Sequence, residues 1–125
     1  MQPGSRNFYA SVLFAVAVTF LAVAPAAGHA VLLESTPALN SSVSGPNVPI
    51  KLRFNVRIDT IRSRLTLLRP DGSAQALEIS KQAPADTLSA EATGLPAGAY
   101  RLRWQVLASD GHITRGEIPF QVTRP

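Results

Sequence analysis

Only two residues in this sequence, His29 and His112, can supply an imidazole for metal binding or proton transfer. The sequence contains no cysteine, which excludes disulfides, thiolate zinc sites, iron–sulfur clusters, c-type haem attachment and blue-copper centres. The single methionine is Met1, so a chain that loses its start carries no sulfur ligand at all. Any metal or proton chemistry that needs an imidazole must therefore use one or both of these histidines.

The second histidine closes the segment Ser109-Asp110-Gly111-His112. A catalytic serine triad composed of Ser109, Asp110 and His112 is disfavoured, because neighbouring side chains on a tight turn point in different directions. Taken alone, Asp110-Gly111 is typical of a two-residue hairpin turn with a solvated histidine beside it. The sequence also lacks a glycine-rich phosphate loop and a Gly-x-Ser-x-Gly motif. Hydrolase and phosphoryl-transfer functions are therefore not expected.

Residues 1–28 have the pattern of a secretory signal peptide. Arg6 provides a positive start, residues 10–24 are uncharged and mostly apolar, and small residues follow at 26–28. A membrane-spanning helix usually needs about 20 apolar residues and a charged stop after them. We therefore predict cleavage and export, with a retained membrane anchor as the alternative.

The position of the cut decides whether a metal site can form. Cleavage after Ala26 and cleavage after Gly28 both fit the small-x-small pattern, and only the second leaves His29 as the first residue. The free amine and the imidazole of a leading histidine can chelate one metal ion through a six-membered ring. His112 and Asp110 would then supply a third nitrogen and a carboxylate oxygen.

This donor set favours Cu(II), with zinc as the nearest rival. Nitrogen-rich sites with a carboxylate or water suit Cu(II), which also has the highest affinity among the divalent ions. The sulfur ligands that would hold Cu(I) are absent, so we expect release on reduction. An amine with a pKa of about 7.7–8.0 and imidazoles near 6.5 must lose protons to bind, so affinity should fall on acidification.

The segments on either side of these residues are predicted to be β-strands. The chain has 125 residues, 46% hydrophobic content and a mean hydropathy of +0.12, which fits one compact domain. After residue 28 the apolar residues alternate with polar ones and no helical period is found. About seven short strands predict an all-β, antiparallel Greek-key sandwich, cupredoxin-like or immunoglobulin-like. The expected strands are 31–35, 50–56, 65–69, 74–79, 87–92, 100–106 and 118–122.

The remaining conspicuous residues fit this sandwich without a functional role. Trp104 and Tyr100 fall on the apolar phase of their strand, so we predict that both are core residues, with the Tyr100 hydroxyl near a rim. The formal net charge is +4, and seven arginines contribute to it: Arg53, Arg57, Arg62, Arg64, Arg69, Arg101 and Arg103. Several of them occupy polar positions of alternating strands in an exported protein. A solvated sheet face is therefore expected, and nucleic acid binding is not.

Several of these segments together resemble the CopC copper-resistance family. The resemblance covers residues 29–125 and rests on the combination of its parts. They are His29-Ala30-Val31-Leu32, Ser35-x-Pro37, Ile50-x-Leu52-x-Phe54-Asn55, Leu95-Pro96-x-Gly98-x-Tyr100-x-Leu102-x-Trp104, Ser109-Asp110-Gly111-His112, Gly116 and Phe120-x-Val122.

The resemblance implies a periplasmic protein that binds and carries Cu(II) for copper tolerance or supply. By matching position, His29 would give amine and imidazole, Asp110 and His112 would complete the metal site, and cleavage would follow Gly28. It also implies a CopD-like membrane copper permease as partner; we expect a monomer. Val31 stands where some members have a further histidine, and Val56 replaces an acidic residue. The methionine-rich Cu(I) loop of other members is absent, so the three-residue site is the one implied.

Three function classes remain to be separated. A carrier or buffer is favoured over an enzyme, because a single saturated metal site and no evident substrate cleft offer little to turn over. The enzymatic alternative is a copper-dependent oxidative enzyme of the histidine-brace type. The third alternative is a metal-free interaction module, since sandwich domains often only bind proteins.

Overall fold

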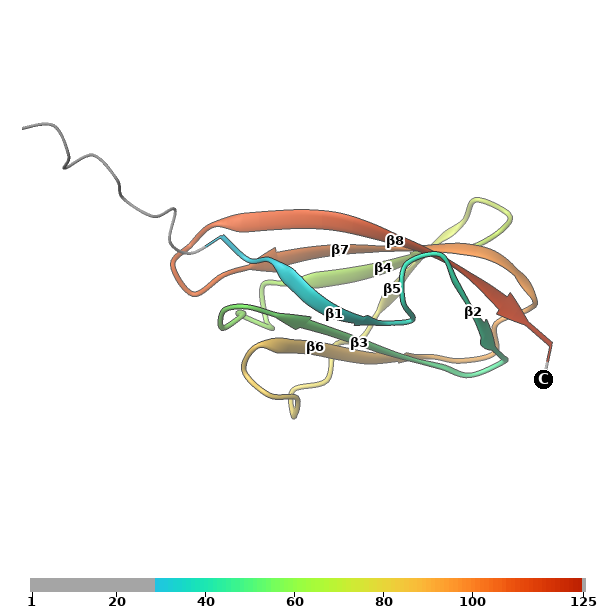
Figure 1. The fold of residues 1–125 in the computed structure, drawn as a ribbon, viewed down its shortest axis with the longest axis horizontal. Helices are drawn as coiled ribbons and strands as arrows, with labels where there is room; N and C mark the ends of the chain where they lie inside the picture. Colours follow the sequence, from blue (N-terminus) through green and yellow to red (C-terminus); the bar gives the residue numbers. More distant parts are fainter. Residues whose placement is uncertain (1–28, 125) are drawn as a thin grey trace, which may run out of the picture.

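The computed structural model describes residues 29–124, and they fold into two β-sheets packed face to face (Figure 1). The expected signal peptide, residues 1–28, lies outside the described residues. One sheet has three strands in the order β1-β3-β6, and the other has five in the order β2-β8-β7-β4-β5. The strands are β1 Leu32–Thr36, β2 Ser41–Ser44, β3 Val48–Phe54, β4 Arg64–Leu68, β5 Ala74–Leu77, β6 Thr87–Ala92, β7 Gly98–Leu107 and β8 Ile113–Thr123. The predicted all-β sandwich without helices is confirmed, with eight strands where about seven were expected.

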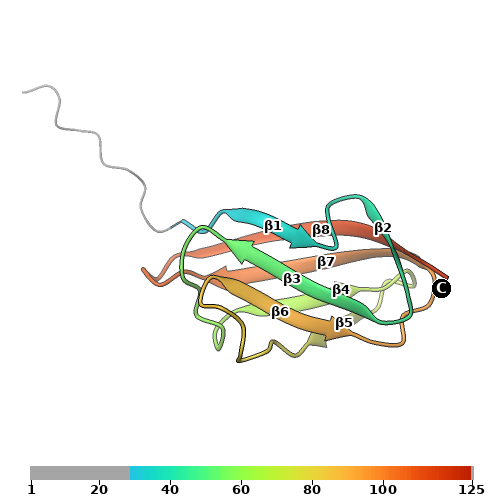
Figure 2. The same ribbon diagram turned by 60° about the horizontal axis from the view of Figure 1, so that its bottom comes forward.

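The layers are arranged so that β1, β3 and β6 cross one side of β8, β7 and β4 (Figure 2). All pairings are antiparallel except that of β2, which runs parallel to the end of β8. No helix among residues 29–124 is long and apolar enough to span a membrane.

The core lies between the sheets and follows from the alternation of the strands. In β3 and β7 the buried residues occupy every second position, as a period of two requires. Phe54 meets Trp104 edge to face with ring centroids 5.2 Å apart, and Tyr100 stacks on Phe120 at 5.7 Å. The Tyr100 hydroxyl donates to the Pro96 carbonyl at 2.6 Å. The predictions that Trp104 and Tyr100 are core residues are confirmed.

Two differences from the expected strands have clear reasons. β2 was not expected, because Ser-Ser-Val-Ser lacks an apolar alternation, and this strand forms by pairing with β8, with Ser41 opposite Phe120. β8 begins at Ile113 rather than at 118. Its first half shows no alternation of apolar and polar residues, because Thr114 and Gly116 occupy the half-buried positions, and it is held in the sheet by pairing with β7.

Candidate metal centre

The two histidines, 83 positions apart in the chain, meet at one end of the sandwich. The centroids of the His29 and His112 rings lie 5.0 Å apart, with the ring planes inclined by 57°. Figures 1 and 2 both show the start of the described chain beside the turn from β7 to β8. Both side chains are exposed, so the pair faces solvent.

The position of His29 is set by the two residues that follow it. Ala30 is buried in the core at 4% exposure. The Val31 amide donates to Asn55 Oδ1 at 2.7 Å, and the Asn55 amide donates to the Val31 carbonyl at 3.1 Å. Asn55 therefore positions the histidine, a role that the sequence analysis did not assign. In the sequence analysis, Asn55 falls within an expected strand and within a segment of the family resemblance, whereas the observed strand β3 ends at Phe54.

The turn that carries His112 is longer than the two-residue hairpin typical of Asp-Gly. Leu107 pairs with Ile113, so residues 108–112 form a five-residue connection. Within it the Gly111 amide donates to the Ala108 carbonyl, and the Ala108 amide donates to the His112 carbonyl, both at 2.9 Å. The Asp-Gly pair thus lies in the middle of a wider loop.

This turn is also fixed to the loop between β3 and β4. Ala108 is buried and forms an isolated β-bridge with Ile58. The Ser109 amide donates to the Arg57 carbonyl at 3.1 Å. The backbone of the turn is therefore held at Ala108 and Ser109, whereas the side chain of His112 is exposed.

Asp110 orients the His112 ring. Its Oδ1 accepts a hydrogen bond from the His112 amide at 3.1 Å, and its Oδ2 lies 2.8 Å from His112 Nδ1. The bonds from the His112 ring and from its amide hold the pKa of Asp110 below its ordinary value. An ionised carboxylate only accepts hydrogen bonds, so this contact requires a hydrogen on Nδ1 and leaves Nε2 as the ring nitrogen that can bind a metal ion.

The sequence-predicted ligand residues thus lie together, with His29 against His112 and Asp110 hydrogen-bonded to His112. Within residues 29–124, however, no group of three or more His, Asp or Glu side chains is arranged to hold a metal ion. The predicted chelate also needs a main-chain amine at residue 29, which exists only after cleavage. The ligand assignment is therefore taken up below as a proposal.

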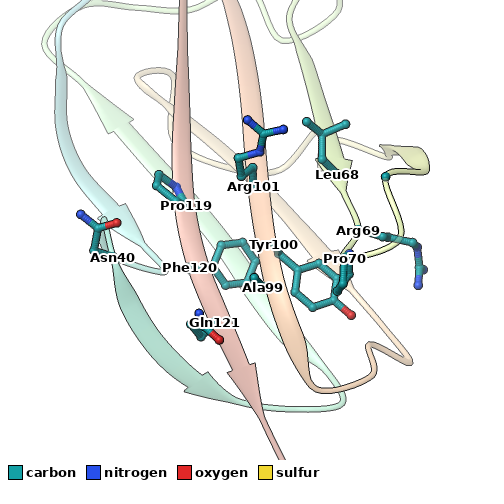
Figure 3. Close-up of a pocket in the computed structure, with 11 residues that line it drawn as sticks. Asn40, Leu68, Arg69, Pro70, Ala99, Tyr100, Arg101, Pro119, Phe120 and Gln121 are labelled. Carbon is teal, nitrogen blue, oxygen red and sulfur yellow. The ribbon is translucent and has the colours of Figure 1, made fainter.

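A surface pocket of about 510 Å3 lies elsewhere on the molecule (Figure 3). Its lining includes Tyr100 and Arg101 at the start of β7 and Phe120 and Gln121 near the end of β8. The turn that carries His112 joins the opposite ends of these two strands. The pocket is therefore not part of the histidine site.

Known proteins provide a separate line of information. The family model described as the CopC domain matches residues 32–123. "Copper resistance protein C" of Xanthomonas campestris pv. juglandis is 34% identical over 110 residues, which cover 82% of this chain and 86% of that protein. The solved structure of CopC from Methylosinus trichosporium OB3b has a TM-score of 0.69 at 28% identity and covers 77% of this chain and 95% of that one. "Copper transport protein CutJ" of Bacillus subtilis is 25% identical over 97 residues, 75% of this chain, and the match spans only 18% of that protein.

Proposed function

The chain belongs to the CopC family, and from this premise we propose that it is a periplasmic Cu(II)-binding protein that carries or buffers copper in resistance or homeostasis. The names of its relatives, a copper resistance protein and a copper transport protein, support a copper-related role. In this proposal residues 1–28 are removed on export, and residues 29–125 form the copper-binding domain.

The observation that carries the proposal is the contact between the two histidine rings. After cleavage at Gly28, His29 contributes its amine and its imidazole, and His112 contributes Nε2. Asp110 contributes a carboxylate oxygen once its side chain turns away from His112 Nδ1, because Nδ1 and Nε2 point to opposite sides of the imidazole ring. Three nitrogens and one oxygen suit Cu(II) better than any other common divalent ion.

The donor set also determines when copper is held and when it is released. Residues 29–125 contain no cysteine and no methionine, so reduction to Cu(I) leaves the ion with none of the soft ligands it prefers. Acidification protonates the amine and the imidazoles and competes with the metal. Copper is therefore bound in its oxidised form near neutral pH and released by reduction or by acid.

A membrane copper permease of the CopD type is proposed as the protein that exchanges copper with this one. CutJ is named a copper transport protein, and its matching segment is a small part of a much longer chain. In our proposal, copper binding and copper transport would be divided between two chains, this one and the membrane permease. We propose that the copper-binding chain itself is a monomer.

We propose that copper is cargo rather than a catalytic cofactor in this protein. The Asp110 carboxylate lies next to the His112 ring. All four Phe, Tyr and Trp side chains within residues 29–124 are buried. The exposed aromatic platform that an oxidative polysaccharide enzyme would use is therefore missing from this part of the chain. Peroxide production from ascorbate by the copper-loaded protein should not exceed that of free copper, and a clear excess would favour the enzyme.

The decisive test combines intact mass and electron paramagnetic resonance on the exported protein. We expect a mass that begins at His29 and, with one equivalent of Cu(II), a spectrum with coupling to three nitrogens. A matched control carries one additional glycine before His29, which displaces the amine and leaves every side chain in place. Its Cu(II) affinity should fall by orders of magnitude, and an unchanged affinity would contradict the chelate.

A further inference from the structure

Exposed aliphatic side chains gather at the histidine end. Within residues 29–124 the exposed large hydrophobic residues are Val31, Leu33, Leu39, Ile61 and Ile113, and Ile61 is the most exposed at 86%. All of them except Leu39 lie at the histidine end, and these four are called the apolar rim below. Exposed apolar groups that cluster, rather than scatter, mark interaction surfaces.

The hydrogen bonds and strand pairs place the apolar rim next to the histidines. Val31 is two residues after His29 on an extended segment, and Ile113 directly follows His112. Leu33 is exposed at the irregular pairing between β1 and β3. Ile61 follows Asp59, whose amide donates to the carbonyl of Leu107, the strand partner of Ile113.

A basic surface begins beside this rim, on the outward face of the five-stranded sheet. Three side chains form a row across β4, β7 and β8: Arg64, Gln105 and Arg115. Along β7 this row lies two residues from the Leu107–Ile113 pair. Arg103 and Arg101 follow on β7. This set of residues, Arg64, Arg101, Arg103 and Arg115, is called the arginine face, and a pocket of about 660 Å3 lies among three of its members.

The arginine face carries more positive charge than it can pair internally. Glu117 is the carboxylate on this face, and it binds Arg103 at 2.9 Å and Arg101 at 3.2 Å. Arg115 donates to the neutral Gln105, and neither Arg64 nor Arg115 forms an ion pair within the described part of the chain. On the outward face of the three-stranded sheet, by contrast, Arg53 is paired with Glu34. Unpaired arginines suit carboxylates supplied by another molecule.

We propose that the apolar rim and the arginine face together form a docking surface for a partner protein whose own surface presents apolar side chains flanked by carboxylates. The inference rests on the proposed function, because docking here would bring the partner's metal ligands to the histidine pair. The apolar contacts would lie over the metal centre, and the carboxylates would meet Arg64 and Arg115 at its side.

The composition of the surface favours a protein over a lipid membrane. The rim is entirely aliphatic, whereas membrane-surface proteins place tryptophan and tyrosine at the headgroup level. Insertion of this end into lipid would also remove the ionised Asp110 from water at high cost. Protein interfaces combine a cluster of apolar side chains with polar side chains at its edge, and they are enriched in arginine. Here the apolar rim would be that cluster, and the arginine face borders it.

The test uses defined probes on the exported, 15N-labelled protein. The probes are a random copolymer of glutamate and tyrosine, polyglutamate, and vesicles of phosphatidylethanolamine and phosphatidylglycerol. We expect the copolymer to bind more tightly than polyglutamate, with amide shifts concentrated at the apolar rim and along the arginine face. Shifts located elsewhere, equal binding of polyglutamate, or preferential binding of the vesicles would overturn the proposal.

Two pairs of variants separate the two parts of the surface. Arg64→Gln with Arg115→Gln, and Ile61→Ser with Ile113→Thr, should each weaken copolymer binding by roughly threefold to tenfold. Lys51→Gln and Leu39→Ser are matched controls outside the surface and should change binding by less than about twofold. Equal losses in the controls would contradict a localised site.

Cu(II) titration of the same samples distinguishes this proposal from the proposed function. All of these variants should bind Cu(II) like the parent protein, because none of the changed residues is a proposed ligand. Normal copper binding without a mapped copolymer site would refute the docking surface alone. Mapped copolymer binding without Cu(II) binding would refute the copper function and leave a protein interface.

Discussion

Two turns of this molecule have the same local structure and different surroundings. Residues 69–73 join β4 to β5, and residues 108–112 join β7 to β8. In each, the first amide donates to the fifth carbonyl and the fourth amide donates to the first carbonyl, all at 2.9 Å. In each, an aspartate at the third position accepts hydrogen bonds from the amide and the side chain of the fifth residue.

The two turns differ in the fifth residue and in what lies beside it. That residue is Ser73 in the first turn and His112 in the second. His112 meets the ring of His29, which is brought there by the burial of Ala30 and the bonds between Val31 and Asn55. The aspartate turn by itself therefore does not make a metal centre, because the same hydrogen bonds form in both places. The candidate metal centre lies on the turn whose histidine faces a second histidine from the segment before β1.

The largest expected effect comes from making the second turn resemble the first. His112→Ser should retain the bond to Asp110, as Ser73 does to Asp71, so the free energy of unfolding should change by less than about 0.5 kcal/mol. Cu(II) affinity should fall by at least about 100-fold, because one nitrogen ligand is lost. Competition titration with a chelator and urea denaturation measure the two quantities. A large loss of stability would show that the turns are not equivalent.

The glycines of the two turns provide a second comparison. Gly72 has a φ of 88° and Gly111 a φ of 95°, and no atom lies within 4 Å of an added Cβ at either position. Alanine at either site should therefore cost about 1–2 kcal/mol of unfolding free energy, from the backbone alone. Only Gly111→Ala should also weaken Cu(II) binding, because it shifts His112. Copper binding that is equally weakened in Gly72→Ala would contradict a local effect.

A smaller effect is expected in acid. Hydrogen bonds from the Ser73 side chain and amide hold the pKa of Asp71 below its ordinary value. A lowered pKa in the folded state stabilises the fold above the unfolded-state pKa of about 3.9, and this contribution is lost as pH falls through the folded-state value. In the variant Asp71→Asn, the free energy of unfolding should therefore decrease less steeply with falling pH below about pH 4. Unfolding curves between neutral pH and pH 2 measure it, and an unchanged slope would argue against the hydrogen-bonded carboxylate.

The smallest effect should come from the reverse exchange. Ser73→His places a histidine on the first turn, but no second imidazole or main-chain amine is supplied there. We therefore expect the exported variant to bind one Cu(II) with unchanged affinity and spectrum. A second tightly bound ion would show that the turn and one histidine suffice, and that the contact with His29 is not essential.

The sequence predicted the sandwich because its core strands alternate strongly. β3 and β7 bury every second residue, and this pattern is visible in the one-dimensional sequence. β2 could not be predicted, because its four residues carry no such pattern and its position depends on a partner about 80 residues away. A strand that packs on the core can be predicted from its own residues, whereas a strand held only by pairing with its neighbour cannot.

The candidate site was predictable in composition but not in geometry. Two histidines, one of them directly after an Asp-Gly pair, left few choices of residues, and the resemblance to a family selected among them. The five-residue turn, the role of Asn55 and the basic face beside the histidines depend on pairing between distant strands. The row of Arg64, Gln105 and Arg115 is an example, because Gln105 pairs with both arginines in the sheet although they are 41 and 10 positions away in the sequence.

The parallel pairing of β2 with β8 has a consequence for the order of folding. β2 lies near the start of the domain, and its neighbour β8 is the last of the described strands, so Ser44 meets Thr123 only after β8 has been made. Contacts of such long sequence separation form late and slowly. A chain still emerging from the ribosome therefore cannot complete its larger sheet.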